Sequence, residues 1–289
     1  MFCNRFGKVE RFMKIDLHMH SNASDGTDEP RKLIQKAAEQ GFEAVALTDH
    51  DTVDGLDAAV EEAAQRGVRL LPGIELSAGG DMEVHVLGYG IKKRALISQK
   101  IAQLRAERGT RANRMVEKLH ELGVGIAMEQ VLRFAKGAVG RPHVARALVE
   151  AGVVQDMDEA FRRYIGREAP AYVPRVYLSV EEAVQWIRTS GGVAVLAHPR
   201  LIRMDQQHLP AMLEKWKAGG LMGVEAYHSA QDATYAARMD ALARHMGLLV
   251  TGGSDYHGDN KTVKMGQGLN RWAKSDIDFY ELCSTIDRL

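Results

Sequence analysis

Short apolar runs alternate with longer amphipathic segments along most of the chain, as expected for parallel strands joined by helical crossovers. Helical periodicity between the runs is clearest at residues 29–40, 57–66 and 180–190. No glycine-rich phosphate turn follows the first run, so the order favours a closed or nearly closed barrel over an open nucleotide-binding sheet. The predicted strands are residues 14–20, 44–48, 69–74, 83–88, 193–197, 222–226 and 248–251.

The strand pattern stops between residues 92 and 170, where the chain becomes charged and helical. Helical periodicity covers 96–122, 141–150 and 157–165 in this stretch, and strand patterning resumes at Val193. This predicts an all-helical insertion that splits the barrel in sequence and can serve as a lid or specificity cap. The predicted organisation is an N-terminal extension without a chemical role at 1–12, a first barrel part at 13–91, the cap at 92–170 and a second barrel part at 171–289.

Composition narrows the class of protein and of partner. A length of 289 residues suits one barrel with an inserted piece, because an α/β barrel alone uses about 200–250 residues. The 38 basic and 38 acidic side chains cancel, so no chain-wide positive field would attract an extended nucleic acid duplex, and any polyanionic substrate must be held locally. Cys3 and Cys283 suit neither a disulfide framework nor a thiolate zinc site, which favours the cytoplasm. No apolar run has the about 18 residues of a membrane helix or the form of a signal peptide.

Side chains that bind metals recur where the predicted strands end. The first run, K-I-D-L-H-M-H-S, places Asp16, His18 and His20 on one face, because side chains alternate along a strand. A single histidine in an apolar strand is more often a hydrogen-bonded core residue than a ligand, but recurrence across strands reverses that preference. Six of the seven predicted strands bring such residues to one end of the barrel: Asp16, His18 and His20; Asp49, His50 and Asp51; Glu75; His85; His198; Asp255 and His257.

The ligand types predict the chemistry. Imidazole and carboxylate without thiolate suit Mn²⁺, Zn²⁺ or Fe²⁺, and the number of ligands exceeds what one ion needs. Metals roughly 3.5–4 Å apart can share a bridging hydroxide, lower its pKa, and neutralise the attacking and leaving oxygens of a phosphoryl group. The sequence therefore predicts a multinuclear centre that hydrolyses a phosphate ester.

The motifs H-M-H, T-D-H-D, G-I-E-L-S, V-H-V-L-G, A-H-P and S-D-Y-H span residues 16–257. In order and spacing they resemble the PHP (polymerase and histidinol phosphatase) family. The likeness is nearest to its stand-alone bacterial branch, which contains nucleoside 3',5'-bisphosphate phosphatases and 5'-to-3' exoribonucleases acting on short RNAs. The resemblance implies a distorted seven-stranded (β/α)7 barrel with an all-helical insertion and three divalent ions per chain, with Mn²⁺ favoured over Zn²⁺ or Fe²⁺.

Carried over position by position, the resemblance implies a ligand set for each ion and three catalytic side chains. Asp25 belongs to the loop S-N-A-S-D-G-T, where the alternative is an aspartate that caps a turn or helix. Asp49 is implied to support a ligand or handle protons, and His198 and His257 to steady the leaving oxygen. The ligand sets are His18, His20, Glu75 and Asp255 for the first ion, Glu75, His85 and His198 for the second, and Asp25, His50 and His257 for the third.

Residues outside the ligand set are candidates for holding the substrate. Arg141 and His143, in G-A-V-G-R-P-H, resemble phosphate contacts of the nucleotidase branch, and arginine suits a phosphate that is not being cleaved. The alternative is an exposed cation and a histidine at a helix start. His228, in E-A-Y-H-S, is predicted to face the same barrel end. Lys136, Arg175 and Arg200 could add charge or be solvated, and A-H-P-R-L lacks the glycine of the usual A-H-P-G-R-Y, which weakens a phosphate role for Arg200.

We therefore predict an enzyme that removes the 3'-phosphate of nucleoside 3',5'-bisphosphates, with the 5'-phosphate held near Arg141. The alternative within the same chemistry is a 5'-to-3' exoribonuclease on short 5'-phosphorylated RNA, and a cyclic-phosphate diesterase or histidinol phosphatase stays open. A different class is a non-catalytic metal-binding interaction module, against which the intact ligand set argues. A further class is metal-dependent amide or lactone hydrolysis, whose barrels usually carry a carboxylated lysine or an aspartate on a late strand.

Overall fold

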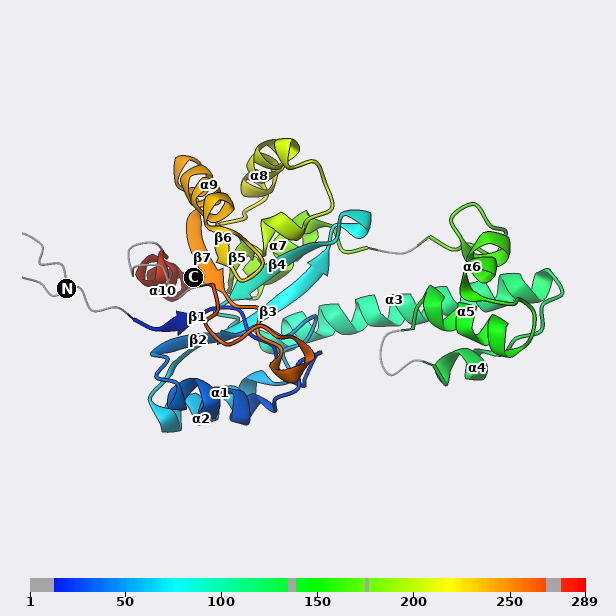
Figure 1. Cartoon of the computed structure of the whole chain (residues 1–289), viewed down its shortest axis with the longest axis horizontal. Helices are drawn as coiled ribbons and strands as arrows, with labels where there is room; N and C mark the ends of the chain where they lie inside the picture. Colours follow the sequence, from blue (N-terminus) through cyan, green and yellow to red (C-terminus); the bar gives the residue numbers. More distant parts are fainter. Residues whose placement is uncertain (1–12, 135–138, 175–176, 269–276) are drawn as a thin grey trace, which may run out of the picture. The chain divides into compact units, whose positions relative to one another are not determined.

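The computed structural model describes residues 13–134, 139–174, 177–268 and 277–289. Within these residues the chain forms two compact units. One contains the residues up to Ser98 and from Leu178 onward, and the other is Gln99–Tyr177. Figure 1 shows a unit built of strands and helices and a unit built of helices alone. The predicted extension at 1–12 lies outside the described residues.

The first unit is built on a sheet of seven strands in sequence order, β1 to β7. Adjacent strands are parallel from β1 to β3 and from β5 to β7. The sheet nearly closes into a barrel, because Leu17 N donates to Gly252 O at 3.3 Å and His20 N donates to Tyr256 O at 2.9 Å. The strands are β1 (Ile15–Asp16), β2 (Ala44–Leu47), β3 (Arg69–Ala78), β4 (Val84–Tyr89), β5 (Val193–Leu196), β6 (Gly223–His228) and β7 (Leu249–Gly253).

Strand β4 departs from the parallel pattern of the other strands, because it runs antiparallel to both β3 and β5. Only a short turn through the 3₁₀ segment Gly80–Met82 separates β3 from β4, and a parallel pair would need a crossover of about a dozen residues. The beginning of β4, rather than its end, therefore lies at the carboxyl end of the parallel strands. His85 reaches the predicted cluster because it is the second residue of β4.

The first strand is shorter than the predicted range 14–20, because β1 ends at Asp16. Beyond it the chain stays extended and pairs with the segment that follows β7. Met19 forms an isolated bridge with Tyr256, and Asp255 N donates to His18 O at 2.9 Å. His18 and His20 thus lie on an extended segment that joins the first and last strands of the barrel.

Helices cover the outer face of the sheet, as Figure 1 shows. All four residues of β2 are buried, which is expected when a strand has the barrel interior on one side and helices on the other. Helix α1 packs against α2, α7 against β3, β4 and β5, and α9 against β6 and β7. The helices of this unit are α1 (Pro30–Glu39), α2 (Leu56–Arg66), α7 (Val180–Thr189), α8 (Leu209–Ala218), α9 (Ala233–His245) and α10 (Phe279–Arg288).

The second unit has a hydrophobic core of its own, formed by side chains such as Met115, Leu119, Val144 and Leu148. Its helices are α3 (Arg94–Glu121), which begins in the first unit, α4 (Met128–Leu132), α5 (Arg141–Glu150) and α6 (Met157–Ala160), followed by a π-helical turn at Phe161–Ile165.

The second unit ends later in the sequence than the predicted cap at 92–170, because Ala171 and Val173 belong to its hydrophobic core. It also starts later, at Gln99, because the first residues of α3 belong to the barrel unit. In the described part of the chain, no helix combines the length and the apolar composition needed to cross a membrane.

Candidate metal centre

The structure brings the nine predicted ligands into one connected group at the carboxyl ends of the parallel strands. Each of them has a ring nitrogen or carboxylate oxygen within 4.0 Å of another member. A β/α barrel uses this end for chemistry because the loops that follow several strands converge there. The members are His18 and His20 after β1, Asp25 in the next loop, His50 after β2, Glu75 on β3, His85 on β4, His198 after β5, and Asp255 and His257 after β7.

Glu75 lies at the centre of the group and is fully buried. Its Oε1 is 2.9 Å from His85 Nδ1 and 2.9 Å from His198 Nε2. One carboxylate thus faces five imidazoles. The rings that face its Oε2 are those of His18 at 3.1 Å, His20 at 3.2 Å and His50 at 3.2 Å.

Asp255 closes the group on the side of β7. Its Oδ1 is 3.2 Å from His20 Nε2 and 3.6 Å from His18 Nε2. Its Oδ2 points away and pairs with Lys261 Nζ at 2.7 Å. Asp255 has a backbone φ of 59° and His198 one of 24°, values that cost free energy for residues other than glycine. Such strain concentrates at functional sites, where the surrounding structure enforces it.

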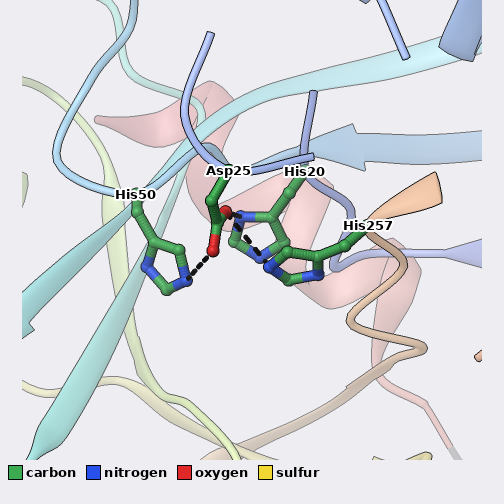
Figure 2. A group of neighbouring side chains, drawn as sticks. All are labelled: His20, Asp25, His50 and His257. Carbon is green, nitrogen blue, oxygen red and sulfur yellow. Dashed lines mark ion pairs between the residues drawn. The ribbon is translucent and has the colours of Figure 1, made fainter. Parts of the chain in front are cut away.

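Asp25 gathers a second set of histidines, shown in Figure 2. Its Oδ1 is 3.2 Å from His257 Nε2 and 3.9 Å from His20 Nδ1, and its Oδ2 is 4.0 Å from His50 Nε2. Asn260 holds the same loop from the far side, because its Nδ2 donates to Asp25 O at 2.6 Å. The structure therefore places Asp25 beside three predicted ligands, whereas the N-cap of the next helix is Glu29.

Asp49 lies behind this loop and accepts three hydrogen bonds from it. Ser21 N, Ser21 Oγ and Ser24 Oγ each donate to its carboxylate at 2.7 Å. These contacts fix the loop that carries Asp25. They give Asp49 a positional role, and its predicted part in proton handling stays a prediction.

The imidazoles of the cluster lower the pKa values of its buried carboxylates. Burial alone would raise the pKa of Glu75, but the surrounding imidazoles, His50 and His18 above all, hold that pKa well below its ordinary value. Burial also opposes ionisation of Asp255, whose pKa is nevertheless lowered by the neighbouring imidazoles of His20 and His228. The same balance lowers the pKa of Asp25 through His257. The carboxylates of the cluster are therefore ionised at neutral pH.

The histidines divide into two classes. Burial lowers the pKa of His18, but the charges of Glu225 and Glu75 outweigh it and raise this pKa well above the ordinary value. The pKa of His20 is raised against burial by Asp255 and Glu75, and that of His85 by Glu75. Burial lowers the pKa of His50 to about 4 and also lowers that of His198. Without cations, the cluster therefore holds protons on some of its rings.

The donor atoms fit divalent cations. Among the described residues, six buried ring nitrogens in this region have no hydrogen-bond partner, although several lie 3.2 Å from a carboxylate oxygen. A buried polar atom without a partner is costly, and a shared cation would satisfy several of these nitrogens together. The nitrogens are His20 Nδ1 and Nε2, His50 Nδ1, His198 Nδ1, His228 Nε2 and His257 Nε2.

The groups of side chains that can hold an ion largely follow the implied ligand sets. His18, His20, Glu75 and Asp255 form one group, with donor atoms within 4.8 Å of one another. The others are Asp25, His50 and His257 joined by His20, then His50, Glu75 and His85, and finally His18, Glu225 and His228.

The predicted substrate residues lie in different surroundings. His228 is buried beside the cluster, with its ring centroid 5.3 Å from that of His198. Arg200 is exposed, and its guanidinium carbon lies 5.1 Å from the centroid of the Tyr235 ring. Arg141 and His143 begin helix α5 of the second unit. Lys136 and Arg175 lie outside the described residues.

Sequence reasoning missed Glu225, which is fully buried on β6 and contacts His18. The available signal was an acidic residue inside an otherwise apolar strand, M-G-V-E-A-Y. It also missed Lys261, whose pairing with Asp255 depends on the path of a loop after β7.

Comparisons with known proteins agree with this site. The family model of the PHP domain matches residues 16–218. A 3',5'-nucleoside bisphosphate phosphatase from Chromobacterium violaceum is 34% identical over 247 residues, which cover 84% of this chain and 87% of the relative. The 5'-3' exoribonuclease Rnm of Escherichia coli is 33% identical over 268 residues, covering 91% of both chains.

A solved structure from Bifidobacterium adolescentis, described as a metal-dependent phosphoesterase, has the same fold with a TM-score of 0.64 and 33% identity. The likeness covers 96% of this chain and 98% of that chain. These relatives match most of this chain and most of their own length, and each is named as an enzyme that acts on phosphate esters. The chain belongs to the PHP domain family and is a metal-dependent phosphoesterase.

Proposed function

We propose that this phosphoesterase hydrolyses the 3'-phosphate of nucleoside 3',5'-bisphosphates and uses three divalent ions, with Mn²⁺ favoured over Zn²⁺ or Fe²⁺. The observation that carries the proposal is the convergence of five imidazoles on the buried carboxylate of Glu75. A relative with 34% identity that is named for this activity supports the choice of substrate. Divalent ions bound at the cluster would lower the pKa of a shared water and offset the charge on the attacking and leaving oxygens.

The contacts of His20 and His50 support the assignment of ligands to separate ions. Each of these rings has one nitrogen 3.2 Å from Glu75 and the other 3.9 Å or 4.0 Å from Asp25. A neutral imidazole offers one lone pair and one N–H, so each ring can bind one ion and donate from its other nitrogen. We assign His20 to the ion beside Glu75 and His50 to the ion beside Asp25.

His228 provides a donor at the edge of the cluster. Its Nδ1 accepts the backbone N–H of Ala230 at 3.1 Å, so a neutral ring carries its proton on Nε2. That Nε2 is buried, has no hydrogen-bond partner, and lies 3.7 Å from Asp255 Oδ2. The N–H can therefore donate to a phosphate oxygen. We keep His198 and His257 as the proposed side chains that steady the leaving oxygen.

The start of helix α5 offers donors for a second phosphate. His143 Nδ1 accepts the backbone N–H of Gly140 at 3.0 Å, which leaves the proton of a neutral ring on Nε2. The guanidinium of Arg141 lies against the rings of Phe161 and Tyr172, at 5.5 Å and 5.8 Å from their centroids. Aromatic faces orient an arginine while leaving its N–H groups available. These contacts support the proposal that Arg141 and His143 hold the 5'-phosphate.

Phosphate release from 3',5'-bisphosphoadenosine tests the proposed reaction. We expect release with Mn²⁺ present and loss of release after chelation, with recovery when Mn²⁺ is restored. Adenosine 5'-monophosphate should accumulate as the product. Metal-dependent cleavage of other phosphoesters without cleavage of the bisphosphate would contradict the substrate while leaving the enzyme class unchanged.

Replacing Arg141 tests the second phosphate contact. Arg141→Ala should raise KM for the bisphosphate roughly 10-fold or more with little change in kcat, because an interaction equal in ground and transition states contributes to binding alone. Arg146→Ala is the matched control, since Arg146 is exposed on the same helix. An equal KM for both variants would remove Arg141 from the substrate site.

A second candidate is 5'-to-3' exoribonuclease activity on short 5'-phosphorylated RNA. The 33% identity to Rnm over 91% of both chains favours it specifically. A site that binds a 5'-phosphate would suit both substrates. In each of them the cleaved bond lies at the 3'-oxygen of the nucleotide that carries this 5'-phosphate. Release of mononucleotides from a 5'-phosphorylated RNA, and not from the same RNA without the phosphate, would establish this activity.

A further inference from the structure

Glu225 is a buried carboxylate in contact with two of the cluster's histidines. Its Oε1 is 2.9 Å from His18 Nδ1, and its Oε2 accepts the backbone N–H of His198 at 2.8 Å. Both oxygens thus contact nitrogen atoms of residues that follow different strands of the barrel. A single side chain on β6 thereby links the segment after β1 to the residue after β5.

A bulge in β6 explains why Glu225 and His228 reach the same site. Glu225 is paired with Thr251 and Tyr227 with Gly252, so Ala226 is an extra residue in the ladder. Such a bulge changes which face the following side chains occupy. Glu225 and His228 would lie on opposite faces of a regular strand, yet both are buried beside His18 and His198.

The contact with Glu225 Oε1 determines which ring nitrogen of His18 keeps a lone pair that can bind a metal ion. An ionised carboxylate only accepts hydrogen bonds, so His18 Nδ1 must carry a proton. The lone pair of a neutral ring is then on Nε2, which lies 3.1 Å from Glu75 Oε2 and 3.6 Å from Asp255 Oδ1. This is the nitrogen that faces the other ligands of the first group.

The contact with Oε2 supports His198 through its backbone. His198 has φ 24° and ψ 64°, a conformation that a residue with a side chain rarely adopts. The hydrogen bond from its N–H to Glu225 favours this conformation, in which His198 Nε2 is 2.9 Å from Glu75 Oε1. Without the bond, the strained backbone would lose a buried partner and the ring would lose its fixed direction.

We propose that Glu225 is a positioning residue for metal binding, which fixes the proton of His18 on Nδ1 and the backbone of His198 in its strained conformation. Glu225 acts through these two histidines and is not itself a ligand, because the proton that His18 Nδ1 donates to it leaves only His18 Nε2, on the far side of the ring, to bind an ion. The alternative is an ion held directly by Glu225, His18 Nδ1 and His228, a group whose donor atoms also lie close together. The two possibilities require opposite nitrogens of His18 to carry the proton.

Glu225→Gln tests the proposal most directly. It keeps the size and shape of the side chain but replaces one of the two hydrogen-bond-accepting oxygens with an NH₂ group. If the amide oxygen accepts from His198, the amide NH₂ faces His18 Nδ1 and moves the ring proton to Nε2. We expect the affinity for Mn²⁺, measured by titration with a competing chelator, to fall about 10- to 100-fold, as loss of a partner to a ligating histidine typically does. The melting temperature of the metal-free variant reports separately on folding.

Glu62→Gln is the matched control, since Glu62 is also buried but bonds to Gln35 and Arg66 on the outer helices. It should bind Mn²⁺ as the unchanged protein does. Wild-type affinity in Glu225→Gln would overturn the proposal. Loss of one whole equivalent of metal, with wild-type affinity for the rest, would overturn it in favour of Glu225 as a ligand.

The unchanged protein loaded with Zn²⁺ provides a test that needs no variant to fold. Long-range ¹H–¹⁵N correlation spectra of the histidine rings identify the protonated nitrogen of His18. We expect the proton on Nδ1 and the metal on Nε2. A proton on Nε2, or metal on Nδ1, would overturn the proposal whatever substrate the enzyme uses.

Discussion

At the scale of single residues, Glu75 shows how much of the site depends on one carboxylate. An ionised carboxylate without water is unstable unless its charge is shared, and Glu75 is fully buried. Five imidazoles surround it, one on β4 and the others on the segments that follow β1, β2 and β5, and they lower its pKa. Cations and protons compete for these rings, so each residue of the cluster affects both metal binding and charge balance.

His198→Ala should abolish turnover while leaving the protein folded. The side chain lies 2.9 Å from Glu75 Oε1, and its loss removes a proposed ligand. The rate should fall more than about 100-fold, since even outer partners of metal ligands cost 10- to 100-fold. Steady-state kinetics and thermal melting measure the two effects. His245→Ala, on the exposed side of α9, is the control, and retained turnover in His198→Ala would contradict the ligand assignment.

At the scale of elements, irregular backbone features aim the functional side chains. The β3–β4 hairpin brings His85 to the site although β4 runs against its neighbours. The bulge in β6 brings Glu225 and His228 to one side. A close approach between β7 and the segment after β1 holds His18 in place, because a side chain at Gly253 would meet His18 Cβ at 2.1 Å and His18 N at 2.6 Å.

Gly253→Ala should therefore destabilise the barrel by about 1–3 kcal/mol, as insertion of a methyl group into a packed region does. The clash involves the backbone of His18, which cannot move away as a flexible side chain could. Urea denaturation measures the change in the free energy of unfolding. Gly125→Ala is the matched control, because a Cβ at Gly125 meets nothing within 4 Å. Equal stability of the two variants would argue against the close approach.

At the scale of the whole molecule, a chain with a net charge of +0 carries a strongly acidic and imidazole-rich centre. The pKa values of His18, His20 and His85 are raised above the ordinary 6.5. A group with a raised pKa stabilises the fold below its unfolded value, and this contribution is lost as the pH rises through the folded value. In the metal-free protein, protons on these histidines therefore supply part of the positive charge that metal ions would supply.

The melting temperatures of metal-loaded and chelated protein should therefore diverge as the pH rises above 6.5. Deprotonation destabilises the metal-free cluster and at the same time frees its rings to bind cations. His50, with a pKa of about 4, stays neutral over this range and does not reverse the trend. Thermal melting with Mn²⁺ or chelator at about pH 6.5 and about pH 8.5 measures the difference. A constant or narrowing difference would contradict this account.

The order of the candidate ligand residues, and their meeting at one end of the barrel, could be predicted from the sequence, while their role as metal ligands stays a prediction. Strand ends are marked by local patterns, such as L-T-D-H-D around His50 and L-A-H-P around His198, and parallel strands bring these ends together. The fold class followed from the same alternation of strands and helices. The domain bounds stay a prediction, and the two compact units of the structure have other bounds because membership of a core depends on packing that local periodicity does not encode.

The direction of β4, the bulge in β6 and the partners of Asp49 and Glu225 were decided only in the tertiary structure. Each depends on contacts between residues far apart in sequence, such as the 207 positions that separate His18 from Glu225. Local patterns report which side chains are buried and where strands end, because burial and chain geometry repeat over a few residues. They do not report which buried acid meets which ring, because that pairing is made by the closure of the barrel.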